Sequence, residues 1–341
     1  MTRDSSILVT GVAGFIGMHV TNALLRAGYR VLGIDDLNGY YSVGLKFDRL
    51  SEISRQFPGK QFRFFQASVE DESALSEIGS SHSINAVVHL AAQAGVRYSI
   101  ESPMAYARSN LVGMTSILEL ARSVNAKHLV YASSSSVYGG NRKIPFSETD
   151  SVDEPASFYA ATKRATEVMA SSYASMFGLP STGLRFFTVY GPWGRPDMAP
   201  WLFTDAILRD KPINIFGHGR PQRDYTYIDD VVMGVLRVLE MAPDHSAKAP
   251  HRILNIGNKQ PVSVMRFIET LEKIIGKSAI RHYVDRQPGD VDITFADTEA
   301  LTALTGYCPQ MQLEEGLGRF VQWFRAYHQF EAASPGHQIA S

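Results

Sequence analysis

The chain has 341 residues, of which 45% are hydrophobic and 20% charged, and its formal net charge is −1. This length and composition are typical of a globular protein with a sizeable core, in one large domain or two modest ones. A charge so close to zero provides no global field to attract nucleic acid or an anionic membrane. We therefore expect neither as a partner, and any anionic ligand must be held by local arginines or backbone amides.

The chain has one cysteine, Cys308, which excludes an internal disulfide framework and a cysteine-based zinc site. We therefore predict no metal and a reducing, cytoplasmic compartment. No stretch approaches the ~20 apolar residues of a membrane-spanning helix. The apolar run at residues 7–10 is too short and too close to glycines for a signal peptide.

Strand and helix patterns alternate from the N-terminus onward. Residues 7–10 and 29–35 predict strands on either side of a helix over 18–27, which ends at Gly28. Further strands are predicted over residues 62–66, 86–90, 128–132 and 181–187, and helices over 110–123 and 159–177. This alternation predicts an α/β fold with a doubly wound, mostly parallel sheet of the Rossmann type.

A glycine-rich turn follows the first predicted strand. Gly11-x-x-Gly14-x-x-Gly17 lies between strand and helix, where glycines allow a tight turn and close approach of a pyrophosphate to the helix N-terminus. Asp35 ends the second strand, where its carboxylate can accept hydrogen bonds from both hydroxyls of an adenosine ribose. Because it would repel a 2′-phosphate, NAD is favoured over NADP.

Tyr159 and Lys163 are spaced i, i+4, so they share one face of the predicted helix. A free tyrosine has a pKa of about 10, and lowering it by ~3 units needs ~4 kcal/mol. One cation at ~4 Å in an effective dielectric of ~20 supplies about that much. Together with a hydroxyl from the run Ser133–Ser136, the pair predicts a phenolate-type base.

After about residue 190 the composition changes, with loops rich in Pro, Gly and Arg up to residue 223. Helices are predicted over 229–241, 262–275 and 313–327, and a strand over 252–256. We expect 229–241 and 252–256 to return to the main sheet. The predicted division is a dinucleotide-binding domain of residues 1–188 plus about 224–258, a smaller mixed α/β substrate domain of about 189–223 plus 259–330, and a disordered tail over 331–341.

These motifs together resemble the extended short-chain dehydrogenase/reductase family over nearly the whole chain. Within it, the chain is most similar to UDP-glucuronate 4-epimerases, on the segments His89–Ser99, Tyr131–Gly139, Arg185–Met198 and Arg223–Asp230. The resemblance implies 4-epimerisation of UDP-glucuronate to UDP-galacturonate through a transient 4-keto sugar, with NAD bound throughout. Tyr159 would take the C4 hydroxyl proton, Ser134 would share that hydrogen bond, and Lys163 would lower the pKa of Tyr159.

The resemblance also assigns binding residues. Besides Tyr159 and Lys163, those expected around NAD are Gly11, Gly14, Phe15, Ile16, Gly17, Asp35, Asp36, Asn38, Ser68, Val69, Leu90, Ala91, Ala92, Gln93, Asn110, Ala132, Phe186 and Val189. Besides Tyr159, those expected around the UDP-sugar are Val96, Arg97, Ser134, Ser135, Ser136, Thr188, Arg195, Phe216, Arg223, Arg286 and Asp290.

Within the substrate set, Phe216 would stack on uracil, Arg223 and Arg286 would bind the diphosphate, and Asp290 would bind the uridine ribose. A guanidinium suits the diphosphate because it binds phosphate bidentately. Arg195 would help to hold a carboxylate or a phosphate. Ser68 departs from the aspartate that many relatives have at the adenine. Either NAD binding is weaker for that reason, or Glu70 or Asp71 would stand in.

The serine run contains no acid, unlike the matching motif of the related dehydratases and decarboxylases. Without a placed acid, elimination loses a catalyst often worth 10²–10⁴-fold. We therefore hypothesise that the hydroxyls of Ser135, Ser136 and Thr188 bind the C6 carboxylate and prevent its loss. Thr188 replaces the usual asparagine of UDP-galactose 4-epimerases.

Two other functions remain open at this point. One is 4-epimerisation of another UDP-sugar, such as a UDP-N-acetylhexosamine or its uronate, and the other is a non-catalytic dinucleotide-binding protein. The family also implies a homodimer joined through a four-helix interface, for which the helices over 110–123 and 159–177 are the candidates.

Overall fold

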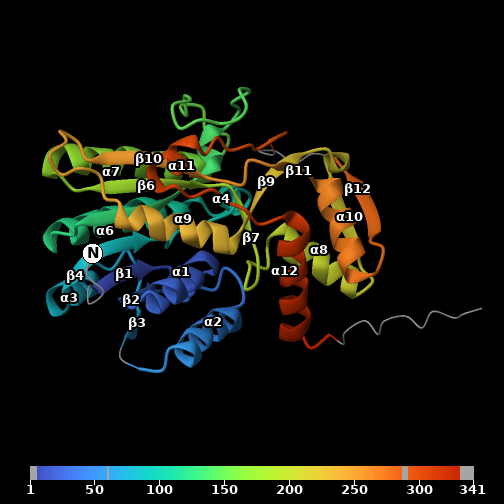
Figure 1. Ribbon diagram of the computed structural model, residues 1–341, viewed down its shortest axis with the longest axis horizontal. Helices are drawn as coiled ribbons and strands as arrows, with labels where there is room; N and C mark the ends of the chain where they lie inside the picture. Colours follow the sequence, from blue (N-terminus) through green and yellow to red (C-terminus); the bar gives the residue numbers. More distant parts are fainter. Residues whose placement is uncertain (1–5, 60, 286–290, 331–341) are drawn as a thin grey trace, which may run out of the picture.

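The computed structural model describes residues 6–59, 61–285 and 291–330. A seven-stranded sheet of order β10-β6-β5-β4-β1-β2-β3 forms the larger part of the molecule, and every neighbouring pair is parallel (Figure 1). Its strands are β1 (Ser6–Thr10), β2 (Arg30–Asp35), β3 (Phe62–Gln66), β4 (Ile84–His89), β5 (His128–Ser134), β6 (Ser181–Phe186) and β10 (His251–Ile256). The predicted parallel sheet is confirmed.

Helices cover both faces of this sheet. One layer contains α1 (Phe15–Arg26), α2 (Val43–Gln56) and α9 (Ile228–Glu240), and the other contains α3 (Glu72–Ser81), α6 (Gly113–Ser123) and α7 (Phe158–Phe177). Because side chains alternate along a strand, Ile7 and Val9 of β1 join the core under α1 and α9, whereas Leu8 joins the core under α6. Burial on both faces explains why the strands are continuous apolar runs.

Local signals set the ends of α7. The Ser157 hydroxyl accepts a hydrogen bond from the amide of Ala160, which caps the N-terminus of the helix. At the other end, Gly178 adopts a left-handed conformation with φ 65°. These caps place Tyr159 in the first turn of α7 and Lys163 one turn later, so both lie at the end of the helix nearest the serine run.

The smaller part of the molecule lies beside the sheet (Figure 1). It contains α8 (Ala199–Leu208), α10 (Val264–Ile275) and α12 (Leu313–Tyr327), with the parallel pair β8 (Pro212–Phe216) and β12 (Ile280–Val284). A three-stranded sheet of β7 (Thr188–Tyr190), β9 (Gln222–Tyr227) and β11 (Pro261–Ser263) joins the two parts.

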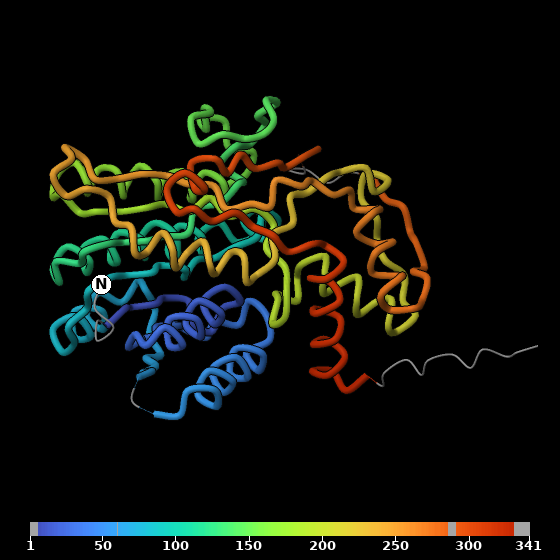
Figure 2. Tube along the Cα trace, viewed as in Figure 1, coloured from blue at the N-terminus to red at the C-terminus, as the bar shows by residue number. Residues whose placement is uncertain are grey.

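The chain passes between the two parts several times (Figure 2). After β8 and β9 it returns to form α9, which contacts α1 and β5, and β10, which extends the main sheet beside β6. This return was expected for residues 229–241 and 252–256. Later, α11 (Glu299–Thr305) contacts α9 and β10, and it is followed by α12, the last helix of the described ranges. The domain limits given above remain a prediction.

The helix expected over 110–123 differs at its start. Two short helices, α4 (Tyr98–Glu101) and α5 (Pro103–Tyr106), lead into a π-helical turn, Ala107–Val112, from which α6 continues. Such turns often lie near functional sites. In the ranges described, no helix combines the length and apolar sequence needed to cross a membrane. The tail expected over 331–341 lies outside those ranges.

Candidate active site

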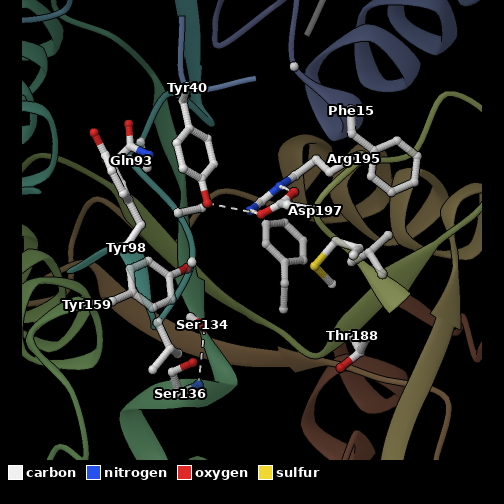
Figure 3. Close-up of a pocket in the computed structure, with 18 of the residues that line it drawn as sticks. Phe15, Tyr40, Gln93, Tyr98, Ser134, Ser136, Tyr159, Thr188, Arg195 and Asp197 are labelled. Atoms are coloured by element: carbon white, nitrogen blue, oxygen red, sulfur yellow. Dashed lines mark hydrogen bonds and ion pairs between the residues drawn. The ribbon is translucent and has the colours of Figure 1, made fainter. Parts of the chain in front are cut away.

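A cavity of about 1060 Å³ opens at the carboxyl ends of the parallel strands, between the main sheet and the smaller part. Its wall includes the residues that follow β1, β2, β3 and β4, together with the ends of β5 and β6. The strand order reverses between β1 and β4, which is where open α/β sheets bind ligands. Figure 3 shows some of its lining side chains.

The glycine-rich turn forms one wall of this cavity. A Cβ at Gly17 would lie 2.0 Å from the carbonyl oxygen of Gly11, so no side chain is possible there. Gly11 itself has φ 71°, and a Cβ on it would lie 2.8 Å from the amide nitrogen of Ala91. The turn therefore packs tightly against the loop after β4, and the N-terminus of α1 faces the cavity, as a pyrophosphate site requires.

Asp35 lies at the end of β2 and is buried. Its two carboxylate oxygens accept hydrogen bonds from the amides of Ala13 and Leu37, at 3.1 and 2.9 Å. Burial raises the pKa of Asp35, and the ammonium of Lys46, 3.9 Å away, opposes that rise. Since each oxygen has a second lone pair, the carboxylate can still accept from ribose hydroxyls.

All but one of the residues expected around NAD line the cavity. The exception, Asn110, is buried behind the wall. Its side chain accepts from the amide of Gln93 at 2.8 Å and donates to the Gln93 carbonyl oxygen and the Thr162 hydroxyl, each at 3.0 Å. Asn110 therefore fixes the loop after β4 against α7.

Ser68 and Val69 line the cavity after β3, as expected. The two acids considered as substitutes at the adenine, Glu70 and Asp71, are not among the lining residues. Asp71 instead caps α3, because its carboxylate accepts from the amide of Ala74 at 3.0 Å. The structure does not place these two carboxylates in the cavity wall.

Tyr159, Lys163 and Ser134 all line the cavity. Burial raises the pKa of Tyr159, while a hydrogen bond with the Ser134 hydroxyl and the charge of Arg195 act to lower it. The Lys163 ammonium donates to the Ala132 carbonyl oxygen at 2.9 Å, and burial lowers the pKa of Lys163 to about 8. Arg195 therefore acts on the phenol as a nearby positive charge. The expected action of Lys163 on the pKa of Tyr159 stays a prediction.

A buried ion pair supports the serine run from behind. Glu167, one turn after Lys163 on α7, forms a bidentate contact with Arg185 of β6 at 2.8 and 2.9 Å. The Ser133 hydroxyl donates to the same carboxylate at 2.6 Å. These contacts join α7, β5 and β6 next to Ser134 in the chain.

The described residues expected around the UDP-sugar also line the cavity; they are Val96, Arg97, Ser134, Ser135, Ser136, Thr188, Arg195, Phe216 and Arg223. The Arg97 guanidinium lies 4.9 Å from the centre of the Phe216 ring. Arg223 donates to the carbonyl oxygens of Gln222 and Val291, each at 2.9 Å. Arg286 and Asp290 lie outside the described residues.

Charges around the cavity are mainly positive. The lining carboxylates, within the described ranges, are Asp35, Asp36 and Asp197. The lining cations are Lys46, Arg97, Lys163, Arg195, Lys211 and Arg223. None of the three carboxylates belongs to the serine run. A ligand with several negative charges suits this wall better than a neutral one.

The cavity residues that sequence reasoning did not identify include Tyr40, Lys46, Tyr98 and Asp197. Tyr40 and Lys46 follow the Asp35 strand, and Asp197 is two residues from Arg195, so proximity to predicted site residues was the available signal. The contacts of Tyr40 with Tyr98 and with Asp197 join segments far apart in the chain.

Comparison with known proteins gives consistent matches. The model of the NAD-dependent epimerase/dehydratase family matches residues 7–257. The probable UDP-glucuronate 4-epimerase of Rhizobium meliloti is 47% identical over 330 residues, covering 93% of this chain and 96% of that protein. UDP-glucuronate 4-epimerase 2 of Arabidopsis thaliana is 44% identical over 340 residues, covering 96% of this chain and 77% of that protein.

Among solved structures, the UDP-glucuronic acid 4-epimerase of Bacillus cereus, in complex with UDP-glucuronic acid and NAD, matches with a TM-score of 0.85. It is 35% identical, and the match covers 94% of this chain and 99% of that one. The fold agrees with these matches. The chain belongs to the NAD-dependent epimerase/dehydratase family.

Proposed function

We propose that the protein converts UDP-glucuronate to UDP-galacturonate by NAD-dependent 4-epimerisation through a transient 4-keto sugar, with the carboxylate retained. The observation that carries the proposal is the convergence of Tyr159, Ser134 and Lys163 on a cavity whose serine run has no acid. The matched relatives named as UDP-glucuronate 4-epimerases support the choice of sugar.

The glycine turn, Asp35 and the loop after β4 fit NAD, because the turn has no room for side chains and Asp35 retains acceptor sites. When bound, NAD accepts hydride from C4 of the sugar and returns it to the other face. Lys163 would hold the nicotinamide ribose from the floor of the cavity, where its charge also favours the phenolate of Tyr159.

Tyr159 would remove the proton of the C4 hydroxyl and give it back when hydride returns. The Ser134 hydroxyl acts to lower the pKa of the phenol and would share the hydrogen bond to the reacting oxygen. Because burial raises the pKa of Tyr159, the base depends on nearby positive charge. Arg195 supplies such a charge, and Lys163 would add to it. The net redox change is zero.

The carboxylate needs protection, since a uronic acid oxidised at C4 is a β-keto acid and tends to lose CO₂. The hydroxyls of Ser135, Ser136 and Thr188 would bind the carboxylate so that the bond to C6 is not aligned with the carbonyl. All three line the cavity. The absence of an acid in this run removes the catalyst that elimination would need.

The nucleotide half would lie against the smaller part of the molecule. Phe216 would stack on uracil, Arg223 and Arg286 would bind the diphosphate, and Asp290 would bind the uridine ribose. Phe216 and Arg223 line the end of the cavity formed by β8 and β9. Arg97, which lies over Phe216, would be close to the same group.

The direct test is NMR analysis of products from purified protein and UDP-glucuronate without added NAD. We expect UDP-galacturonate to form from UDP-glucuronate, so that the mixture contains both 4-epimers and no UDP-pentose. A panel of UDP-sugars, including UDP-N-acetylhexosamines and their uronates, separates the alternative substrates. Turnover of one of these but not of UDP-glucuronate would contradict the proposed substrate.

The proposal includes a homodimer, supported by apolar side chains that α7 and the π-helical turn expose, namely Val112, Val168, Met176 and Phe177. We expect Val168→Glu to convert a dimer into a monomer in light scattering, and an unchanged mass would contradict this interface. A cytoplasmic location is proposed on the single cysteine.

A further inference from the structure

Three polar side chains form a network across the cavity (Figure 3). The Tyr40 hydroxyl donates to the Asp197 carboxylate at 3.1 Å. The Arg195 guanidinium contacts the same carboxylate through Nε, at 3.0 Å, and through Nη2, at 2.5 Å. Tyr40 belongs to the loop after β2, whereas Arg195 and Asp197 lie between β7 and α8. The network therefore joins the cofactor side of the cavity to the substrate side.

The geometry leaves part of Arg195 for another anion. Asp197 occupies the edge formed by Nε and Nη2, and Nη1 is not part of this contact. An arginine can bind a second acceptor through its remaining edge. The exposed fractions of Arg195 and Asp197 are 21% and 32%, so solvent screens the pair only partly. Although burial acts to lower it, the pKa of Arg195 is raised by Asp197, and the cation is retained.

Aromatic rings complete a second connection between Tyr40 and Tyr159. Ring centres lie 4.8 Å apart for Tyr40 and Tyr98, 6.1 Å for Tyr98 and Tyr106, and 6.0 Å for Tyr106 and Tyr159. Tyr106 is fixed in turn, because its hydroxyl donates to the Gly95 carbonyl oxygen at 2.5 Å. Tyr40 thus contacts both Asp197 and the aromatic row that ends at Tyr159.

We propose that Tyr40 and Asp197 are positioning residues that hold Arg195 opposite Tyr159, with the free edge of the guanidinium directed to an anionic group of the substrate. The inference rests on the proposed function and extends it to the residues that hold in place the cation acting on Tyr159. The loop that carries Tyr40 also carries Asp36 and Asn38, which line the cofactor side. Ordering of this loop around the cofactor would therefore also fix Arg195.

The test variant is Tyr40→Phe, which keeps the ring and removes one hydroxyl. Burial and the neighbouring Asp197 raise the pKa of Tyr40 to about 12, so the substitution changes no charge at assay pH. The charged or titratable groups that face Tyr159 and Arg195 are Lys163 on α7, Tyr106 on α5, Tyr40 and Asp197. Of these, Tyr40→Phe alters only Tyr40 directly.

We expect Tyr40→Phe to retain its NAD, to raise the KM for UDP-glucuronate about tenfold, and to move the acidic limb of kcat to higher pH by roughly half to one unit, as loss of a nearby cation predicts. The matched control is Tyr327→Phe, which removes a similar bond to Asp48 outside the cavity. If the two variants share the same KM and pH profile, the proposal is overturned.

Asp197→Asn adds a test of direction. If Asp197 acted only as a negative charge, its loss would lower the pKa of Tyr159 and move the acidic limb to lower pH. If it holds Arg195 in place, the cation is displaced and the limb moves to higher pH. We expect the second result, and a shift to lower pH would contradict the positioning role.

Crystal structures of NAD-loaded wild-type and Tyr40→Phe proteins provide a readout that needs no turnover. We expect Arg195 on Asp197 in the wild type and a displaced or multiply placed guanidinium in the variant. An unchanged Arg195 in the variant overturns the positioning role. Lack of turnover of every UDP-sugar by the wild type contradicts the proposed function instead, so the two failures are distinguishable.

Discussion

The ammonium of Lys163 donates to the carbonyl oxygen of Ala132 at 2.9 Å, two residues before Ser134 in the chain. This bond ties α7 to the end of β5, so the phenol, the serine hydroxyl and the ammonium keep fixed relative positions. Burial lowers the pKa of Lys163 to about 8, which leaves most of it charged at neutral pH. The ammonium of Lys163 is therefore held charged at a buried position where an apolar side chain would make the protein more stable.

Replacing Lys163 by methionine should stabilise the nucleotide-free protein and inactivate the enzyme. Removing the buried charge should raise the unfolding free energy by about 3 kcal/mol at pH 7. Leaving the Ala132 carbonyl oxygen without its donor should lower it again by about 1 kcal/mol. Because the lysine pKa falls from 10.5 to about 8 on folding, the advantage of the variant is full below pH 8 and shrinks toward pH 10.5. Urea unfolding at pH 7 and pH 9.5 measures this, and a constant difference would contradict the buried charge.

The buried pair of Glu167 and Arg185 should be the most sensitive structural contact near the site. Glu167→Ala leaves Arg185 buried without its counter-charge and Ser133 without its acceptor, which we expect to cost about 3–5 kcal/mol in unfolding free energy. Arg164→Ala is the matched control, since Arg164 contacts the same carboxylate from a half-exposed position and should cost less than about 1 kcal/mol. Equal losses in chemical denaturation would show that burial of the pair is not the cause.

The central sheet could be predicted from sequence because its strands are apolar on both faces, but α2 could not. The buried face of α2 comprises Leu45, Lys46, Arg49, Leu50 and Ile53. Two of these five are cations, so the helix lacks the apolar stripe that predicts an amphipathic helix. Arg49 is fully buried because its guanidinium donates to the carbonyl oxygens of Ala13, Trp193 and Gly194.

The site residues that could be identified from the sequence are those that belong to local patterns. The glycine turn and the Tyr159–Lys163 pair are such patterns, because the spacing of their residues in the sequence determines how they lie in the structure. The contact between Tyr40 and Asp197 joins residues 157 apart, and no local spacing encodes it. Arg195 was expected near the site, but its action on Tyr159 depends on how β7 and α8 fold back over the cavity.

Thr188→Val should weaken retention of the substrate carboxylate, because valine keeps the shape of threonine and removes the hydroxyl. We expect epimerisation of UDP-glucuronate to fall about tenfold, as for one lost hydrogen bond to a charged group, with UDP-pentose appearing among the products. NMR assay of both 4-epimers and of UDP-pentose measures this. Thr302→Val, on α11 away from the cavity, is the control. Unchanged epimerisation and no UDP-pentose in Thr188→Val would contradict a role of this hydroxyl in holding the carboxylate.

Gly17→Ala should abolish dinucleotide binding. The added Cβ would lie 2.0 Å from the Gly11 carbonyl oxygen, so the turn must open and its amides lose their arrangement at the N-terminus of α1. We expect NAD released on denaturation to fall from about one per chain to less than a tenth of that, by order of magnitude, as a cost of a few kcal/mol implies.

Gly318→Ala on α12 is the matched control for this substitution, because a Cβ there meets no atom within 4 Å. Alanine is the better helix former, so this variant should keep its NAD and gain roughly 0.5–1 kcal/mol in unfolding free energy. If Gly17→Ala retains NAD as fully as Gly318→Ala, the tight turn is not what holds the cofactor.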